Sequence, residues 1–188
     1  MPGNRVAKDD LRIVYHSILL ATSRISSSFF EVVRQRNETE VESVYRERVY
    51  CYELYHQLRQ LLPDHFPYVI HGELDKRGQH FVNSLLNGDY APDLLVHRPG
   101  RMQNLVIMEV KPAACSPSEA DHDIEKMAGF ISNVHYQMGI LLFFGPNPVR
   151  QKCRQEDGIV YLHHKKAMTP ALRVRLPEPD TVYDLGIG

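Results

Sequence analysis

Apolar positions follow a helical period through the first third of the chain. Their three- and four-residue spacing predicts a helix over residues 9–35. Residues 37–40 are typical of a turn and an N-cap, and a second helix is predicted from about Thr39 to Leu62. One stripe of this second helix consists of Val41, Val44, Tyr45, Tyr52 and Tyr55. We interpret the three tyrosines of that stripe as core, although tyrosines can also be platforms on which nucleobases stack.

Beyond Pro67 the pattern changes to short extended segments. Strands are predicted over residues 68–74, 91–97, 104–111, 138–144 and 158–163. A helix with its apolar positions on one side is predicted over residues 121–133, between the third and fourth strands. We expect the first three strands to form a meander and the helix to return the chain to the same sheet. The fold class is therefore α/β, with a mixed central sheet, helices on both faces and an extra N-terminal helix.

The strand over residues 104–111 changes character at its C-terminal end. Strict alternation assigns Val106, Met108 and Val110 to one face, and Leu105, Ile107, Glu109 and Lys111 to the other. Two charges at the end of an otherwise apolar strand are costly unless they are paired or bound to a metal. This end of the strand is therefore a candidate site.

A second acid is expected at the same place. Asp93 opens the preceding strand, and a turn signal at residues 98–103 joins the two strands. In an antiparallel pair the start of one strand lies beside the end of the other, so we expect Asp93 to lie close to Glu109 and Lys111. Carboxylates suit Mg²⁺, which can polarise a phosphate and activate a water. Lys111 would orient that water or neutralise charge on the phosphate, and the main-chain carbonyl of Val110 is a further candidate ligand.

These motifs resemble the PD-(D/E)xK nuclease superfamily, which has the restriction-endonuclease-like fold, and more closely a group of small bacterial members of unsettled role. The resemblance extends over roughly residues 40–145 and leaves the first helix unexplained. The matching stretches are residues 47–50, 52–55, 73–76, 91–98 and 104–111, and residues 123–127 resemble the helix that follows.

The resemblance implies a metal-dependent nuclease that hydrolyses nucleic acid, with DNA as the favoured substrate. Asp93 and Glu109 would be ligands of Mg²⁺ or Mn²⁺, and Lys111 would be the catalytic lysine. Many such folds add an acid from the helix before the sheet. Glu47 fits that role best, and Glu53 and Glu73 remain alternatives.

Composition changes this picture in two ways. With 188 residues, 43% of them hydrophobic, the chain can form a single core. We expect residues 38–188 to form the nuclease-like domain and residues 1–37 to be a helical element for docking or for a homodimer. The net charge is −1 and the pI about 6.8, less basic than is usual for proteins that wrap tightly on DNA. A second interpretation therefore stays open, a non-catalytic nucleic-acid-binding or protein-interaction module that retains the fold.

Other sequence features favour an ordinary cytoplasmic protein. No stretch approaches the roughly 20 apolar residues needed to cross a bilayer, and the first residues do not resemble a secretory signal, so we expect no membrane partner. The three cysteines, Cys51, Cys115 and Cys153, stand far apart, which argues against a structural zinc site and against a disulfide framework.

Overall fold

The computed structural model describes residues 3–37, 40–72, 90–101, 103–146, 156–164 and 182–184. The helices are α1 (Gly3–Arg24), α2 (Glu47–Leu61) and α4 (Pro117–Val134), and a short 3-10 helix, η1 (Ser27–Phe29), follows α1. The strands are β1 (Glu31–Gln35), β2 (Val41–Tyr45), β3 (Val69–Gly72), β4 (Leu94–Arg98), β5 (Gln103–Pro112), β6 (Tyr136–Phe144), β7 (Ile159–His164) and β8 (Val182–Asp184). Within these described ranges, no helix has the length and apolar character that a membrane crossing requires.

Six strands form one mixed sheet in the order β3-β4-β5-β6-β7-β8. The first three pair antiparallel as a meander, and each later strand joins parallel to its neighbour. Parallel neighbours need a crossover connection, and α4 provides the one between β5 and β6. The predicted mixed α/β sheet, its meander and its crossover helix are therefore confirmed.

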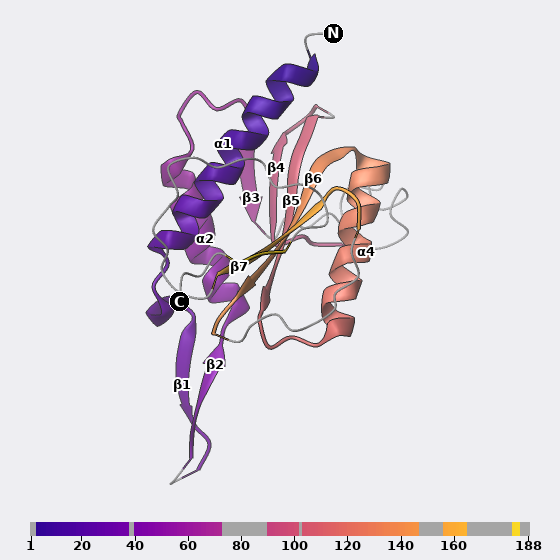
Figure 1. The fold of residues 1–188 in the computed structure, drawn as a ribbon. Helices are drawn as coiled ribbons and strands as arrows, with labels where there is room; N and C mark the ends of the chain where they lie inside the picture. Colours follow the sequence, from indigo (N-terminus) through magenta and orange to yellow (C-terminus); the bar gives the residue numbers. More distant parts are fainter. Residues whose placement is uncertain are drawn as a thin grey trace.

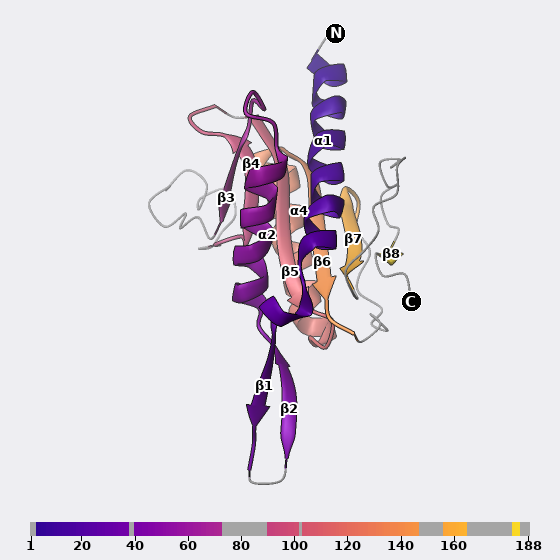
Figure 2. The ribbon, with the colours of Figure 1, turned by 90° about the vertical axis from the view of Figure 1, so that its left-hand side faces the viewer.

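Helices cover both faces of the sheet, as predicted. Helices α1 and α2 lie on one face and α4 lies on the other (Figure 1, Figure 2). Two apolar clusters fill the two layers: Ile18 and Leu54 belong to the first, and Ile124, Met127 and Phe130 to the second. Helix α1 thus packs its apolar stripe into the core that it shares with α2. A docking or dimerisation role for residues 1–37 stays a prediction.

The chain between α1 and α2 differs from the prediction. Helix α1 ends at Arg24, and β1 and β2 form a hairpin that projects from the body of the molecule (Figure 1), so α2 begins at Glu47 rather than near Thr39. The hairpin segments are rich in valine, whose branched side chain favours extended backbone. The predicted turn is present, because the Asn37 side chain accepts the backbone N–H of Glu40.

Strict alternation along β5 fails at one residue. In the pairing of β4 with β5, Val96 lies opposite Val106, but the next residue, His97, lies opposite Asn104. Leu105 therefore has no partner on β4 and is the extra residue of a β-bulge. Leu105 therefore joins the cluster beneath α1 and α2, and its predicted place on the face of Ile107 was wrong.

The prediction that Tyr52 is core was also wrong, because its side chain is 60% exposed.

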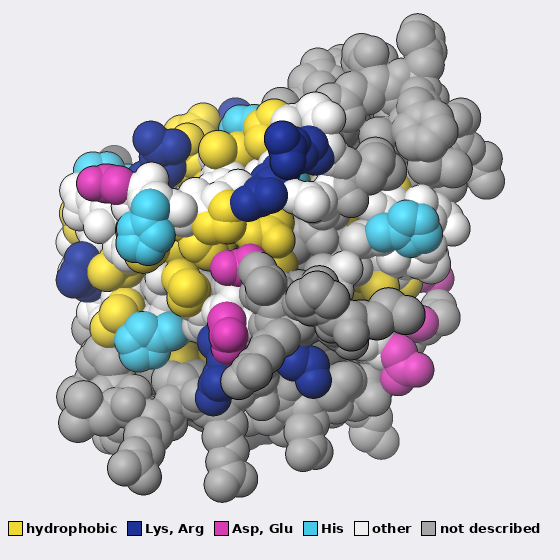
Figure 3. All heavy atoms as spheres, turned by 90° about the horizontal axis from the view of Figure 1, so that it is seen from above, with side chains coloured by type: hydrophobic (Ala, Val, Ile, Leu, Met, Phe, Trp, Pro, Cys, Tyr) yellow, Lys and Arg dark blue, Asp and Glu magenta, His cyan; other side chains and the backbone are white. Residues whose placement is uncertain are grey.

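The surface seen from above mixes side chains of every kind (Figure 3). Basic side chains are scattered there among acidic, histidine and hydrophobic ones. Among the described residues on this face, no continuous basic patch is visible, in line with the net charge of −1.

Candidate functional site

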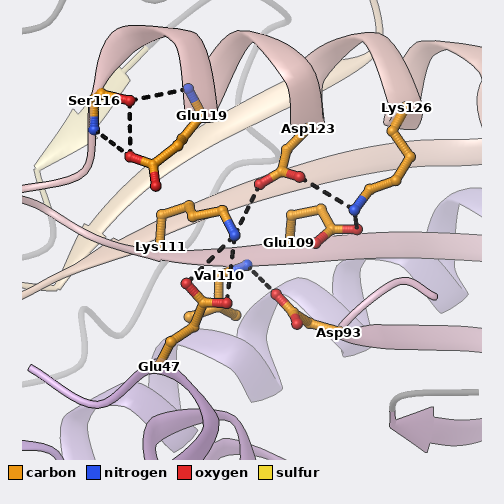
Figure 4. Close-up of polar contacts among 9 residues, drawn as sticks. All are labelled: Glu47, Asp93, Glu109, Val110, Lys111, Ser116, Glu119, Asp123 and Lys126. Atoms are coloured by element: carbon orange, nitrogen blue, oxygen red, sulfur yellow. Dashed lines mark hydrogen bonds and ion pairs between the residues drawn. The ribbon is translucent and has the colours of Figure 1, made fainter. Parts of the chain in front are cut away.

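Six charged side chains gather around the C-terminal half of β5 (Figure 4). They come from four segments of the chain, and we call them the charged cluster: Glu47, Asp93, Glu109, Lys111, Asp123 and Lys126. Glu109 and Lys111 belong to β5, and Asp123 and Lys126 belong to α4. Glu47 is the first residue of α2, and Asp93 immediately precedes β4. The cluster therefore lies where both helical layers meet the end of the central strand.

Asp93 lies against β5, as the antiparallel register predicts. Leu94 is opposite Met108, and the Oδ2 atom of Asp93 accepts a hydrogen bond of 2.7 Å from the backbone N–H of Val110. Burial raises the pKa of Asp93, although this hydrogen bond and the nearby Lys111 ammonium act in the opposite direction. The expected neighbours are thus brought together, with Asp93 held by the main chain of β5.

Lys111 lies between carboxylates of the two helical layers. Its Nζ atom is 3.3 Å from both carboxylate oxygens of Glu47 and 3.1 Å from Oδ2 of Asp123. Burial alone would lower the pKa of Lys111, but the charges of Asp123 and Glu47 raise it above its ordinary value. The ammonium is therefore charged at neutral pH.

Glu109 is the most deeply buried acid of the cluster, at 2% exposure. Its Oε1 atom lies 2.7 Å from Nζ of Lys126, which is also 3.1 Å from Oδ1 of Asp123. Burial, and then repulsion from the Asp93 carboxylate, raise the pKa of Glu109 well above its ordinary value. In the described part of the chain, Oε1 of Glu109 and Oδ2 of Asp123 lack a well-directed hydrogen bond. The ion pairs alone do not offset the full free-energy cost of removing these carboxylates from water.

The start of α4 fixes where Asp123 and Lys126 lie. A capping box closes this helix terminus: Ser116 Oγ accepts the backbone N–H of Glu119 at 3.3 Å, and Glu119 Oε2 accepts the N–H of Ser116 at 2.7 Å. Residues three apart lie on the same side of a helix, so Asp123 and Lys126 reach the sheet together. Sequence reasoning did not assign either of them to the site. The signals were their three-residue spacing, which many solvated helix faces share, and the resemblance of residues 123–127 to the helix that follows the motif in the superfamily.

Glu47 is the acid of α2 that reaches the cluster. It stands in the first turn, where the helix dipole favours a carboxylate. Burial raises the pKa of Glu47, and Lys111 opposes that rise. The alternative Glu53 accepts a hydrogen bond of 2.6 Å from Gln57, and among the described residues no ion pair joins it to the cluster. The other alternative, Glu73, lies outside the described residues.

The charged cluster carries an excess of negative charge. Four carboxylates and two ammonium groups give it a formal charge of −2 when all six are ionised. Its oxygen donors are of the kind that Mg²⁺ prefers. Nevertheless, the described residues include no three His, Cys, Asp or Glu side chains already arranged to hold a metal ion. Each of the two ammonium groups lies between two carboxylates of the cluster, so a bound cation would share these acids with Lys111 and Lys126.

No protein-family model, curated protein or solved structure matches this chain. The geometry and charge of the cluster are therefore the grounds on which a function can be inferred.

Proposed function

We propose that the chain is a metal-dependent phosphodiesterase of the PD-(D/E)xK type, with a restriction-endonuclease-like fold, that hydrolyses nucleic acid and preferably DNA. One observation carries the proposal. Asp93, Glu109 and Lys111, which the strand pattern predicts to converge, lie within one cluster around β5 (Figure 4). The cluster combines acids, which can hold a metal ion, with a charged lysine, which can stabilise charge that develops on a phosphate.

The donor set fits a divalent cation. The carboxylates of Asp93 and Glu109 repel each other in a buried site, which contributes to the raised pKa of Glu109. A cation would compensate both charges, as well as the formal excess of −2 in the cluster. Asp93, Glu109, the carbonyl of Val110 and Glu47 are the residues that would hold Mg²⁺ or Mn²⁺. When bound there, the ion would supply a polarised phosphate and a water of lowered pKa.

Lys111 is the residue through which the chain would act on the phosphate. Its ammonium is charged at neutral pH and can donate hydrogen bonds to a phosphate oxygen or to the attacking water. Glu47 and Asp123 hold the ammonium in position from opposite sides. Asp93 is held in turn by the Val110 N–H, so the acid and the lysine keep a fixed relation through β5.

A non-catalytic module is the second candidate, and the pair of Glu109 and Lys126 favours it. At 2.7 Å, the Lys126 ammonium already neutralises the buried acid and so reduces its need for a metal. Such a module would use the same fold to bind nucleic acid or a protein partner. The net charge of −1 suits a protein partner at least as well as a long nucleic acid.

Cleavage assays with the wild-type protein distinguish the two candidates. End-labelled single-stranded, duplex and branched DNA, and RNA, are incubated with Mg²⁺, Mn²⁺ or a chelator, and the products are separated on denaturing gels. We expect cleavage of at least one substrate with metal and none with the chelator, because the carboxylates act through the ion. Intact substrates under every condition would favour the non-catalytic module, and cleavage in the chelator would contradict metal dependence.

A further inference from the structure

A hollow of about 390 Å³ opens directly beside the charged cluster. Tyr52 and Tyr55 of α2 and His71 of β3 line it with aromatic rings. Asp93 lines the same hollow and is also the acid that accepts the Val110 N–H. The hollow and the candidate active site therefore share a residue.

We propose that this hollow binds an unpaired nucleobase of the substrate, so that the enzyme acts on single-stranded or locally unpaired nucleic acid. This inference rests on the proposed nuclease function, because it assigns a substrate class to the same site. The occupant is one flat heterocycle, and its own backbone phosphate would lie on the side of Asp93, toward the cluster.

The lining of the hollow suits a flat, uncharged group. Among the described residues the lining is mainly apolar and aromatic, and it includes Gly72 and the buried Cys51 and Leu94 beside the rings. Its volume is near the lower end of the roughly 300–1,000 Å³ that is usual for ligand sites, which fits a small aromatic group. Asp93 is the one acidic group among the described lining residues, so an anion such as a phosphate would be the wrong occupant.

Two of the rings have the properties of stacking platforms. Tyr52 leaves 60% of its side chain exposed on α2, although so large an apolar ring would gain free energy from burial. His71 is held in one orientation, because its Nδ1 atom lies 2.9 Å from Nε2 of His97 in a perpendicular ring contact. One exposed ring and one fixed ring beside an apolar hollow are the elements that bind a stacked base.

An unpaired base fits better than a base in a duplex. A paired base is stacked on both sides and must be extruded before it can enter a pocket, whereas a single strand presents its bases freely. The net charge of −1 also limits the affinity that phosphate contacts alone can supply. Base stacking would therefore contribute a large share of the binding free energy.

Fluorescence anisotropy with a labelled oligothymidylate tests the hollow without any need for cleavage. Binding is measured with Ca²⁺ in place of Mg²⁺, for the full protein and for Tyr52→Ala. We expect the variant to bind about five- to tenfold more weakly, the lower part of the range for a lost stacking ring, since Tyr52 is exposed. Binding of a strand of the same length that carries abasic residues is expected to be weak and equal in both proteins.

Three further variants separate stacking from unfolding. Tyr52→Phe keeps the ring and is expected to retain wild-type affinity. Phe29→Ala removes an aromatic ring of 46% exposure that does not line the hollow, and is expected to change nothing. Gly72→Val is expected to fill the hollow and weaken binding, because a Cβ there would meet Leu94 and Tyr55 at the ordinary distances of 3.5 and 3.8 Å.

The outcomes distinguish this inference from the proposed function. Equal affinity of the wild-type protein for the thymidylate and abasic strands, or unchanged binding by Tyr52→Ala, would overturn the base site even if cleavage is found. Ring-dependent binding without cleavage of any substrate would support the base site and overturn the proposed hydrolysis.

Discussion

Replacing Lys111 by alanine is expected to slow metal-dependent cleavage by about 10²–10³-fold, the effect typical of removing one donor that stabilises transition-state charge. The ammonium lies within 3.3 Å of Glu47 and 3.1 Å of Asp123, and these acids keep it protonated. A neutral side chain leaves the phosphate charge without this partner. Single-turnover rates with saturating Mg²⁺ measure the loss at the chemical step.

Two comparisons make this result specific. Lys8→Ala removes a lysine from the exposed side of α1 and is expected to leave the rate unchanged. Lys111→Ala should also keep a cooperative thermal transition, which shows that the loss is not caused by unfolding. Cleavage by Lys111→Ala at the wild-type rate would exclude this lysine from the active site.

Replacing Lys126 by methionine is expected to destabilise the metal-free protein by about 3–5 kcal/mol, the usual effect of removing one partner of a buried ion pair. The Lys126 ammonium is the close partner of Glu109, which is 2% exposed, and also contacts Asp123. Without it, the buried Glu109 carboxylate loses the ammonium that lies 2.7 Å from its Oε1 atom. Denaturant unfolding of the two proteins in a chelator measures the difference.

The same variant should reveal how pH acts on the cluster. Because the folded-state pKa of Glu109 is raised above 4.5, the folded protein keeps a proton that the unfolded chain has lost. The contribution of Glu109 to the free energy of unfolding is therefore largest below pH 4.5, and it decreases as the pH rises from 4.5 toward the folded-state pKa. The raised pKa values of Asp93 and Glu47 act in the same direction. Loss of Lys126 should steepen the fall, and Mg²⁺ should restore stability more at pH 8 than at pH 5.

A double variant identifies the group responsible. Lys126→Met combined with Glu109→Gln removes both charges of the pair, and is expected to recover most of the lost stability and to lose the steeper pH dependence. Equal stability of Lys126→Met and wild type at pH 5 and pH 8 would contradict the pairing of Lys126 with Glu109.

The sheet could be predicted from the sequence because its strands carry strong local signals. The apolar run of β6 and the alternation at the end of β5 each indicate a strand, and the short turn between β4 and β5 makes those two strands pair. The approach of Asp93 to β5 follows from that antiparallel register alone. Glu47 was the preferred additional acid from the helix before the sheet, and its contact with Lys111 agrees with its position in the first turn of α2.

The hairpin of β1 and β2 could not be predicted from spacing. Val32, Val33 and Val41 are exposed on a projecting arm, so no buried face imposes a period on this segment. Apolar residues that happened to lie three or four apart were then interpreted as helical. Branched side chains and the turn at Asn37 were the better signals.

Asp123 and Lys126 were missed for a different reason. Their role depends on the orientation of α4 about its own axis where it packs on the sheet, and tertiary packing determines that orientation. Along the chain they look like an ordinary polar stripe beside Ile124 and Met127. Only tertiary structure brings them to within 3.1 Å of Lys111 and 2.7 Å of Glu109, respectively.

Calorimetric titration of Mn²⁺ tests most directly whether the charged cluster is a divalent-metal site. The wild-type protein is compared with Asp93→Asn, which removes one proposed ligand, and with Glu53→Gln, which removes an acid of α2 that is outside the cluster. The proposed site predicts saturable Mn²⁺ binding by the wild type and by Glu53→Gln, and its loss in Asp93→Asn. Absence of binding by the wild type, or equal binding by Asp93→Asn, would contradict it.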